Sequence, residues 1–296
     1  MYKSILGTTK IIGLVGNPVG HSISPVLHNT LAQKYNLDIV YVPFLVNEDC
    51  FEDAIKGLRA LNVEGFNVTV PYKTKIMQYM DRNTESVFLM GAVNTVKNIK
   101  GKFYGYNTDG EGFNRAFKEE TKTDFKNKKV AILGAGGSAR SIGVIVAQND
   151  AEQVVFINRT LEKAEEIETL INQKIKKVAK SFDFGNENFK NALIESEIII
   201  NTTSMGMHPD IDDSPISDLE CFNRQVVYDV IYNPMSTKFL KDAKSRGCHI
   251  CNGLGMLFYQ GILAFEIWTG IEISDNCTYE MYKFFTEYTN KMYGNL

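Results

Sequence analysis

Two short polar segments in the first third of the chain carry an amine and a carboxylate that could exchange a proton with a small molecule. Asn67, Thr69 and Lys73 lie in the segment NVTVPYK, and Asp109 lies in YNTDG. Side chains two residues apart on a strand share a face, and Pro71 should end the strand and turn Lys73 back over its carboxyl edge. Such an amine and carboxylate could move the proton of an alcohol as a general acid and base. Taken singly, Lys73 is more typical of a solvated surface lysine, and Asp109 is more typical of a helix cap or an Asx-turn.

Hydroxyl and amide side chains in neighbouring loops suit a small hydroxylated acid. Ser22 and Ser24 follow an expected strand, and we expect Ser24 to be the N-cap and Pro25 the first residue of a helix. Two hydroxyls beside exposed helical N–H groups favour a carboxylate, although Ser24 could also do no more than cap the helix. Asn94, in GAVNT, adds an amide. Together the set predicts a ligand with one carboxylate and several hydroxyls.

A second candidate site lies at residues 130–140, which read VAILGAGGSAR. A short apolar strand breaks into glycines that open an apolar helix, the arrangement that binds a dinucleotide's pyrophosphate at a helix N-terminus. Gly134 would make the tight turn, Gly136 would let the backbone approach the phosphates, and Ala139 would let the helix pack on the strand. The same string also occurs in ordinary strand-to-helix turns, so its apolar flanks decide in favour of a cofactor site.

The residues after the next strand indicate which dinucleotide binds. The expected strand 153–157 is followed by Arg159, with no acidic residue to accept the ribose 2′-OH of NAD. Arg159, and Lys163 about one turn into the next helix, could neutralise a 2′-phosphate. We therefore expect NADP rather than NAD. The alternative is a solvated arginine at the end of a strand.

Alternating strands and helices should position both groups of residues, which is typical of parallel sheets covered by helices. Before the glycine turn we expect strands at 11–15, 39–44 and 65–70, helices at 25–35, 49–61 and 72–80, a hairpin of 93–98 with 102–106, and a helix from 108 toward 120. After it we expect strands near 153–157, 178, 197–201, 225–230 and 249–251, and then helices at 254–269 and 277–293. The glycine-rich stretch 105–112 is the expected domain boundary.

Composition excludes several classes of protein. A net charge of −3 over 296 residues gives no electrostatic case for nucleic acid or a membrane surface, and no apolar stretch is long enough to span a bilayer. The first residues lack the pattern of a signal peptide, and the five cysteines are scattered, so we expect reduced thiols and a cytoplasmic protein. The lone CHIC at 248–251 predicts a strand rather than a metal site. No metal is expected.

Nine ordered segments make the chain similar to the shikimate dehydrogenase family over nearly its whole length. They are HSISPVLHN from residue 21, NVTVPYK from 67, GAVNT from 91, YNTDG from 106, GAGGSAR from 134, NRT from 158, NTTSMGM from 201, YDVIYNP from 228 and NGLGMLFYQ from 252. The resemblance implies reversible, NADP-dependent reduction of 3-dehydroshikimate to shikimate, on the route to chorismate and the aromatic amino acids. It also implies an α/β fold of two domains. These are an open, mainly parallel substrate domain of residues 1–109 plus 253–296, and a Rossmann-like, doubly wound NADP domain of residues 110–252.

The resemblance also implies roles for individual residues. The implied catalytic residues are Lys73 and Asp109, with either of them able to carry the transferred proton. The implied substrate ligands are Ser22 and Ser24 for the carboxylate, Tyr232 near it, and Asn67, Thr69, Asn94, Asp109 and Gln260 for the ring hydroxyls. The implied cofactor residues are Gly134, Gly136, Gly137, Ser138 and Ala139 at the pyrophosphate, Asn158, Arg159, Thr160 and Lys163 at the 2′-phosphate, and Thr202, Ser204, Met205, Gly253 and Met256 toward the nicotinamide.

Two other functions stay open at the level of sequence. A relative that oxidises quinate with NAD would differ near Ser22 and Tyr232, because quinate carries one more hydroxyl at the carboxylate-bearing carbon. A non-catalytic sensor on the same fold would be expected to lack Lys73 or Asp109, and both are present. Gly261 stands where the family commonly carries alanine. The sequence does not choose between a monomer and a homodimer.

Overall fold

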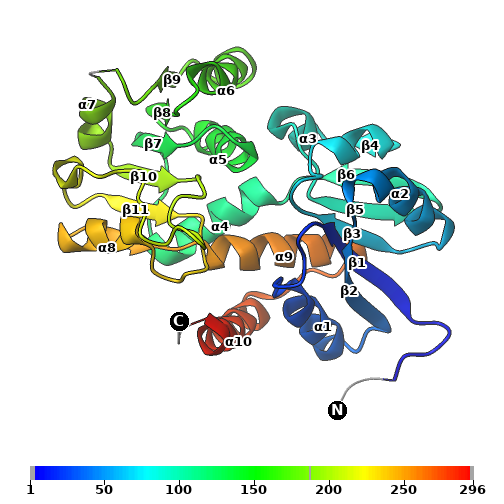
Figure 1. Cartoon of the computed structure of the whole chain (residues 1–296). Coiled ribbons are helices and arrows are strands. Elements are labelled where there is room, and N and C mark those ends of the chain that lie inside the picture. Colours follow the sequence, from blue (N-terminus) through cyan, green and yellow to red (C-terminus); the bar gives the residue numbers. More distant parts are fainter. Residues whose placement is uncertain (1–3, 187, 294–296) are drawn as a thin grey trace. The chain divides into compact units, whose positions relative to one another are not determined.

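The structure is a computed structural model that describes residues 4–186 and 188–293. The chain divides into two compact units, each made from two stretches of sequence (Figure 1). The first unit comprises Met1–Thr108 and Gln260–Glu287, and the second comprises Asp109–Tyr259 and Tyr288–Leu296. The long helices α9 (Leu254–Thr269) and α10 (Asp275–Tyr293) each contribute residues to both. The boundaries of the substrate and NADP domains expected from the sequence, between residues 109 and 110 and between residues 252 and 253, stay a prediction.

The first unit is built on a six-stranded mixed sheet in the order β2-β1-β3-β5-β6-β4. Its elements are β1 (Lys10–Gly16), α1 (Ser24–Lys34), β2 (Ile39–Leu45), η1 (Glu48–Cys50), α2 (Phe51–Ala60), β3 (Gly65–Val68), η2 (Lys75–Tyr79), β4 (Arg82–Asn83), α3 (Glu85–Met90), β5 (Thr95–Ile99) and β6 (Lys102–Tyr106). β1 pairs in parallel with β2 and β3, whereas β5 is antiparallel to β3 and β6. The predicted hairpin is therefore present.

Both faces of this sheet are covered, because alternate residues of its strands are apolar on either side. Ile12 and Leu14 pack with Trp268 of α9 on one face, and Val15 packs with Phe51 of α2 on the other. The Trp268 indole N–H donates to the main-chain oxygen of Val96, 2.9 Å away. That bond fixes the end of α9 to β5.

The region around residues 70–90 differs from the sequence-based expectation. The helix expected at 72–80 is only the 3-10 helix η2, and β4 and α3 were not predicted. This segment is held by tertiary contacts rather than by an apolar period of its own. Arg59 donates to Asp81 at 2.7 Å and to the main-chain oxygen of Tyr79 at 3.0 Å. Asp81 in turn accepts from the backbone N–H of Phe103 at 2.7 Å.

The second unit contains a six-stranded, wholly parallel sheet in the order β9-β8-β7-β10-β11-β12. Its elements are α4 (Asp109–Thr121), β7 (Lys129–Leu133), α5 (Gly137–Gln148), β8 (Gln153–Ile157), α6 (Leu161–Lys174), β9 (Ala179–Phe182), α7 (Asn188–Glu195), β10 (Ile198–Asn201), η3 (Leu219–Cys221), β11 (Val226–Asp229), α8 (Lys238–Ser245) and β12 (His249–Cys251). Counted along the chain this is the order 3-2-1-4-5-6 of dinucleotide-binding folds. The predicted Rossmann-like, doubly wound fold is confirmed.

Helices lie on both faces of the second sheet (Figure 1). Leu133, Ile157 and Ile199 point toward α7 and α8, where they pack with Leu193 and Phe239. The strands are nearly continuous apolar runs, as expected when both faces are buried. Within residues 4–186 and 188–293, none of the helices is both long enough and apolar enough to cross a bilayer.

Candidate functional site

The predicted substrate residues of the first unit lie around one edge of its sheet. β1, β3 and β6 end at this edge, and β5 begins there because it runs antiparallel to β3 and β6. The loops that carry the predicted residues therefore meet at this edge. In the order β2-β1-β3, the strand that follows β1 in the chain lies on one side of it, and the next strand, β3, lies on the other side. The strand order therefore reverses between β1 and β3, and ligands of open α/β sheets bind at such a point.

Asn67 and Asn94 form the centre of a buried polar network, with 6% and 2% of their surfaces exposed. The Asn67 amide donates to the main-chain oxygen of Asn94 at 3.1 Å and to the Thr95 hydroxyl at 3.0 Å. Its oxygen accepts from the Tyr41 phenol at 2.8 Å. Both amide hydrogens are thus used within the protein, and the oxygen keeps a second lone pair. Asn67 can therefore accept a hydrogen bond from a ligand hydroxyl.

Asn94 connects three segments of the chain. Its amide nitrogen donates to Thr108 Oγ1 at 2.9 Å and to Gln260 Oε1 at 3.4 Å, and its oxygen accepts from the Thr108 backbone N–H at 2.8 Å. Gln260 is itself only 9% exposed. Of the predicted ring-hydroxyl ligands, the structure thus brings Asn67, Asn94 and Gln260 together.

Ser24 has a different local role from the one expected. It is the first residue of α1, so that Pro25 is the second, and the N-cap position is occupied by Ile23 without a side-chain cap. The predicted Ser24 cap is wrong, because Ser24 already lies within the first turn of α1. Ser22 lies just before the helix, and its oxygen accepts from the Ser24 backbone N–H at 3.3 Å.

Thr69 and Lys73 lie in the loop after β3, which ends two residues earlier than predicted. The Thr69 N–H donates to the main-chain oxygen of Val15 at 2.9 Å, and a Cβ on Gly16 would overlap the Thr69 methyl group. Gly16 thus leaves the space into which Thr69 packs. Lys73 is half-buried, and its main-chain oxygen accepts from Val93, the residue before Asn94, at 2.8 Å. This bond fixes the Lys73 backbone beside the amide network.

Asp109 is the first residue of α4 and directly follows Thr108. It is 8% exposed, which is uncommon for a carboxylate that does no more than begin a helix. The acidic first turn suits the positive end of the helix dipole. Asp109 belongs by its contacts to the second unit.

The glycine turn after β7 has the shape that a pyrophosphate requires. Gly134 has φ = +108°, and a Cβ there would lie 2.6 Å from Thr202 Oγ1. Gly136 is the N-cap of α5, and a Cβ on it or on Gly137 would meet nothing within 4 Å. Ala139 is fully buried against the sheet. Bare backbone N–H groups at a helix start with open space before them fit a phosphate group, and Ser138 lies in the same turn.

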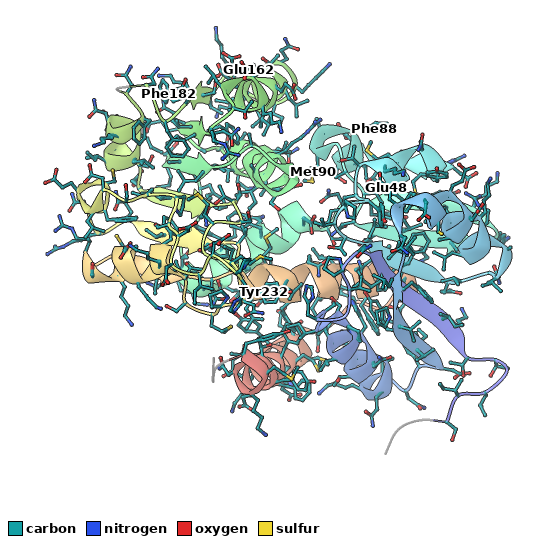
Figure 2. All side chains as sticks on the ribbon, in the orientation of Figure 1. Glu48, Phe88, Met90, Glu162, Phe182 and Tyr232 are labelled. Atoms are coloured by element: carbon teal, nitrogen blue, oxygen red, sulfur yellow. The ribbon has the colours of Figure 1, made fainter. Side chains whose placement is uncertain are left out.

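The end of β8 carries the predicted 2′-phosphate residues. Thr160 is the N-cap of α6, and the Asn158 amide donates to the Thr160 main-chain oxygen at 2.7 Å. Arg159 and Lys163 are exposed. Figure 2 shows Glu162 in the first turn of α6 and Phe182 at the end of the neighbouring strand β9. Two cations beside a helix N-terminus fit a phosphate monoester.

The predicted nicotinamide-side residues follow β10, beside β7 in the sheet. The Thr202 hydroxyl donates to the Leu133 main-chain oxygen at 2.6 Å, which ties this loop to the glycine turn. Ser204 and Met205 are exposed, Met205 to 41%. β7 and β10 flank the point where the strand order reverses. The predicted cofactor residues after β7, β8 and β10 thus lie along one carboxyl edge.

A buried aspartate supports the loops after β10 and β11. Asp229 is fully buried and accepts from Asn201 at 3.0 Å, Thr237 at 2.6 Å and the Ile231 N–H at 3.1 Å. Burial raises the pKa of this carboxyl to about 6, although the three donors act against the rise. Asn201 also accepts from Thr203 at 2.7 Å.

Tyr232, Gly253 and Met256 lie in the second unit, and Figure 2 shows Tyr232 in the segment after β11. Burial raises the pKa of the Tyr232 phenol to about 12, so it is protonated at neutral pH. A Cβ on Gly253 would overlap the main-chain oxygen of Val230, so glycine is required by close packing of two backbones. Met256 follows in α9 and is 9% exposed.

Sequence reasoning missed the residues that support the predicted ligands. Thr95 and Thr108 are adjacent to Asn94 and Asp109 in their motifs, so the motifs themselves held that signal. Tyr41 lies on β2, outside all of the polar loops, and no local pattern distinguished it. The first unit as a whole can bind a carboxylate and hydroxyls, and the second can bind a phosphorylated dinucleotide.

Comparison with known proteins agrees with a ligand-binding first unit and a dinucleotide-binding second unit. Residues 14–96 match the shikimate dehydrogenase substrate binding domain, residues 116–224 match the shikimate / quinate 5-dehydrogenase model, and residues 253–278 match the shikimate 5'-dehydrogenase C-terminal domain. The chain is 44% identical over 273 residues to "Shikimate dehydrogenase (NADP(+))" of Caldanaerobacter subterraneus subsp. tengcongensis, covering 92% of this chain and 96% of that relative.

Two crystal structures extend the comparison to bound ligands. The shikimate 5-dehydrogenase of Listeria monocytogenes, in complex with shikimate and NAD, has a TM-score of 0.88 at 37% identity and covers 95% of this chain and 99% of that one. The Thermus thermophilus shikimate 5-dehydrogenase, in complex with NADP(H) and shikimate, has a TM-score of 0.82 at 28% identity and covers 93% and 99%.

Proposed function

The chain belongs to the shikimate dehydrogenase family, and we propose from this premise how its residues perform the reaction of that family. It is an NADP-dependent oxidoreductase that reversibly reduces 3-dehydroshikimate to shikimate, a step toward chorismate and the aromatic amino acids. When bound, NADP supplies or accepts the hydride. The protein binds and orients both molecules and moves the proton.

The substrate is held through its two kinds of polar group. Ser22 and Ser24, at the start of α1, bind the carboxylate through their hydroxyl groups. Tyr232 assists there as a protonated donor. The hydroxyls are bound by the amide network and its neighbours, which are Asn67, Thr69, Asn94 and Gln260.

Lys73 and Asp109 act as the acid–base pair on the oxygen of the reacting carbon. During the reduction of the ketone, the acid of the pair, an ammonium or a protonated carboxyl group, gives a proton to that oxygen and regains one from solvent afterwards. Either member of the pair can carry the transferred proton.

The cofactor is held by the carboxyl edge of the second sheet. The glycine turn from Gly134 binds the pyrophosphate, and Arg159 and Lys163 bind the 2′-phosphate. The nicotinamide half would be held by Thr202, Ser204, Met205, Gly253 and Met256. The selection of NADP over NAD rests on two cations and on the absence of an acidic residue at 158–160.

One observation above all supports this proposal. The main-chain oxygen of Lys73 accepts from the N–H of Val93, the residue next to Asn94 in the amide network. Replacement Lys73→Ala should lower kcat for shikimate oxidation by about a hundredfold or more while changing shikimate binding less. Lys75→Ala is the matched control, because Lys75 is two residues away but pairs with Glu48 at 3.8 Å. The turnover of both variants is followed at the absorbance of reduced nicotinamide. Near-normal kcat in Lys73→Ala would refute the proposed role.

Quinate oxidation with NAD is the alternative reaction, and Arg159 and Lys163 count against it. Steady-state rates with both acids and both cofactors separate the two. Faster turnover of quinate with NAD than of shikimate with NADP would overturn the assignment.

We also propose a cytoplasmic location, supported by five cysteines that are all free thiols, four of them buried. A homodimer is the proposed alternative to a monomer, and sedimentation of the purified protein distinguishes them. Fractionation of the cells that produce the protein tests the location.

A further inference from the structure

Tyr41, on β2, lies outside every polar loop of the predicted site but connects two of them. Its side chain is 2% exposed. The phenol donates to the Asn67 oxygen at 2.8 Å, and the Ser24 side chain lies beside it. Ser24 follows β1 and Asn67 lies on β3, so the Tyr41 hydroxyl lies between the two sides of the point where the strand order reverses.

The Tyr41 ring is held from several directions. The His28 ring stacks on it with centroids 4.4 Å apart, and Trp268 lies at 6.0 Å. Its backbone is paired with the Asn29 side chain, which donates to the Tyr41 oxygen at 3.0 Å and accepts from its N–H at 2.8 Å. His28, Asn29 and Ser24 all belong to α1. Tyr41 therefore fixes where the start of α1 lies relative to β3.

We infer that Tyr41 is a positioning residue for substrate binding, which sets the separation between the carboxylate-binding serine Ser24 and the hydroxyl-binding amide of Asn67. This inference rests on the proposed function. A cyclohexene carboxylate is rigid, so its carboxylate and hydroxyls can be bound together only if the two protein groups keep a fixed separation. A buried aromatic ring that stacks on His28 and whose backbone is paired with Asn29 can keep that separation, whereas a flexible loop cannot.

The chemistry of the phenol suits this role. Burial raises the pKa of Tyr41 above its ordinary value, so it remains a hydrogen-bond donor to Asn67 at every pH at which the protein works. The donated proton fixes which way the Asn67 amide is turned. Asn67 then presents its remaining lone pair in one direction.

Replacement Tyr41→Phe removes the hydroxyl and keeps the stacked ring. It should raise KM for shikimate about tenfold, the loss of about one hydrogen bond, and leave kcat and KM for NADP within about twofold. The matched control is Tyr72→Phe. Tyr72 is also buried in the first unit, but its hydroxyl donates to the main-chain oxygen of Val46 at 2.7 Å. This control should leave KM for shikimate unchanged while costing similar stability, as measured by Tm.

Coupling to Ser24 gives a readout that a merely structural role would not move. Ser24→Ala should raise KM for shikimate, and adding Tyr41→Phe should raise it by much less than the product of the single effects. Asn29→Asp, which loses the donor to the Tyr41 oxygen but keeps the phenol, is a second route that should shift KM in the same direction. It keeps the test open if Tyr41→Phe folds poorly.

The outcomes separate this inference from the proposed function. Suppose that the wild-type protein turns over shikimate normally. If Tyr41→Phe and Asn29→Asp then both keep the wild-type KM for shikimate, only the role of Tyr41 is overturned. The same holds if the effects of Ser24→Ala and Tyr41→Phe on KM multiply fully. Wild-type protein that turns over no shikimate with NADP would overturn the proposed function itself.

Discussion

His28 gives the first unit a stability that should decline on mild acidification. The side chain is 2% exposed, and within the described residues neither ring nitrogen has a hydrogen-bond partner. It stacks on Tyr41 and lies edge-on to Trp268 at 5.1 Å. Because this apolar site does not solvate a charge, burial lowers the pKa of His28 from 6.5 to about 3.

The sign of the effect follows from which state binds the proton. Below pH 6.5 the unfolded chain protonates this histidine, whereas the folded chain keeps it neutral down to about pH 3. The contribution of His28 to the free energy of unfolding is therefore fully present above the unfolded pKa and is lost as the pH falls below it. Between pH 7 and pH 5 the loss amounts to about 2 kcal/mol. Asp229 has the opposite sign, because a carboxyl whose pKa is raised to about 6 takes up a proton in the folded state first.

A variant isolates the histidine from all other groups. His28→Phe keeps an aromatic ring against Tyr41 and cannot titrate, so its free energy of unfolding relative to wild type should rise by about 2 kcal/mol from pH 7 to pH 5. Denaturant unfolding followed by tryptophan fluorescence suits the test, because Trp268 is the only tryptophan of the chain and contacts His28. Tyr72→Phe is the control, since it replaces a buried ring but removes no group that titrates in this range. A pH-independent difference between His28→Phe and wild type would refute the reasoning.

Two further predictions concern the second unit. Gly253→Ala should destabilise the protein by more than about 2 kcal/mol and lower turnover, because the new Cβ overlaps the Val230 carbonyl; Gly57→Ala, in open space on α2, should be neutral or stabilising. Thermal unfolding compares the two, and equal midpoints would contradict the packing argument. Arg159→Ala should lower kcat/KM for NADP by about ten- to a hundredfold and leave that for NAD nearly unchanged. Lys174→Ala, at the other end of α6, is its control, and a parallel loss with both cofactors would contradict a 2′-phosphate role.

The element pattern could be predicted from sequence wherever an element carried its own period or punctuation. The strands of the second unit are apolar runs between turns, and α9 was predicted with the bounds it has in the structure, 254–269. The segment 72–90 could not be predicted, because Tyr79 and Asp81 are held there by Arg59 and Phe103 from outside it. Such contacts leave no local periodicity to detect.

The sequence by itself determined the inventory of chemistry: a glycine turn, a cation in place of an acidic residue at Arg159, and motifs that contain Lys73 and Asp109. Those signals are local, because a turn or a cap needs particular residues at fixed spacing. Only the tertiary structure decided how the groups are supported. Tyr41 on β2 and Asn67 on β3 meet because both strands pair with β1. Contacts between residues far apart in the chain exist only once the sheet has formed.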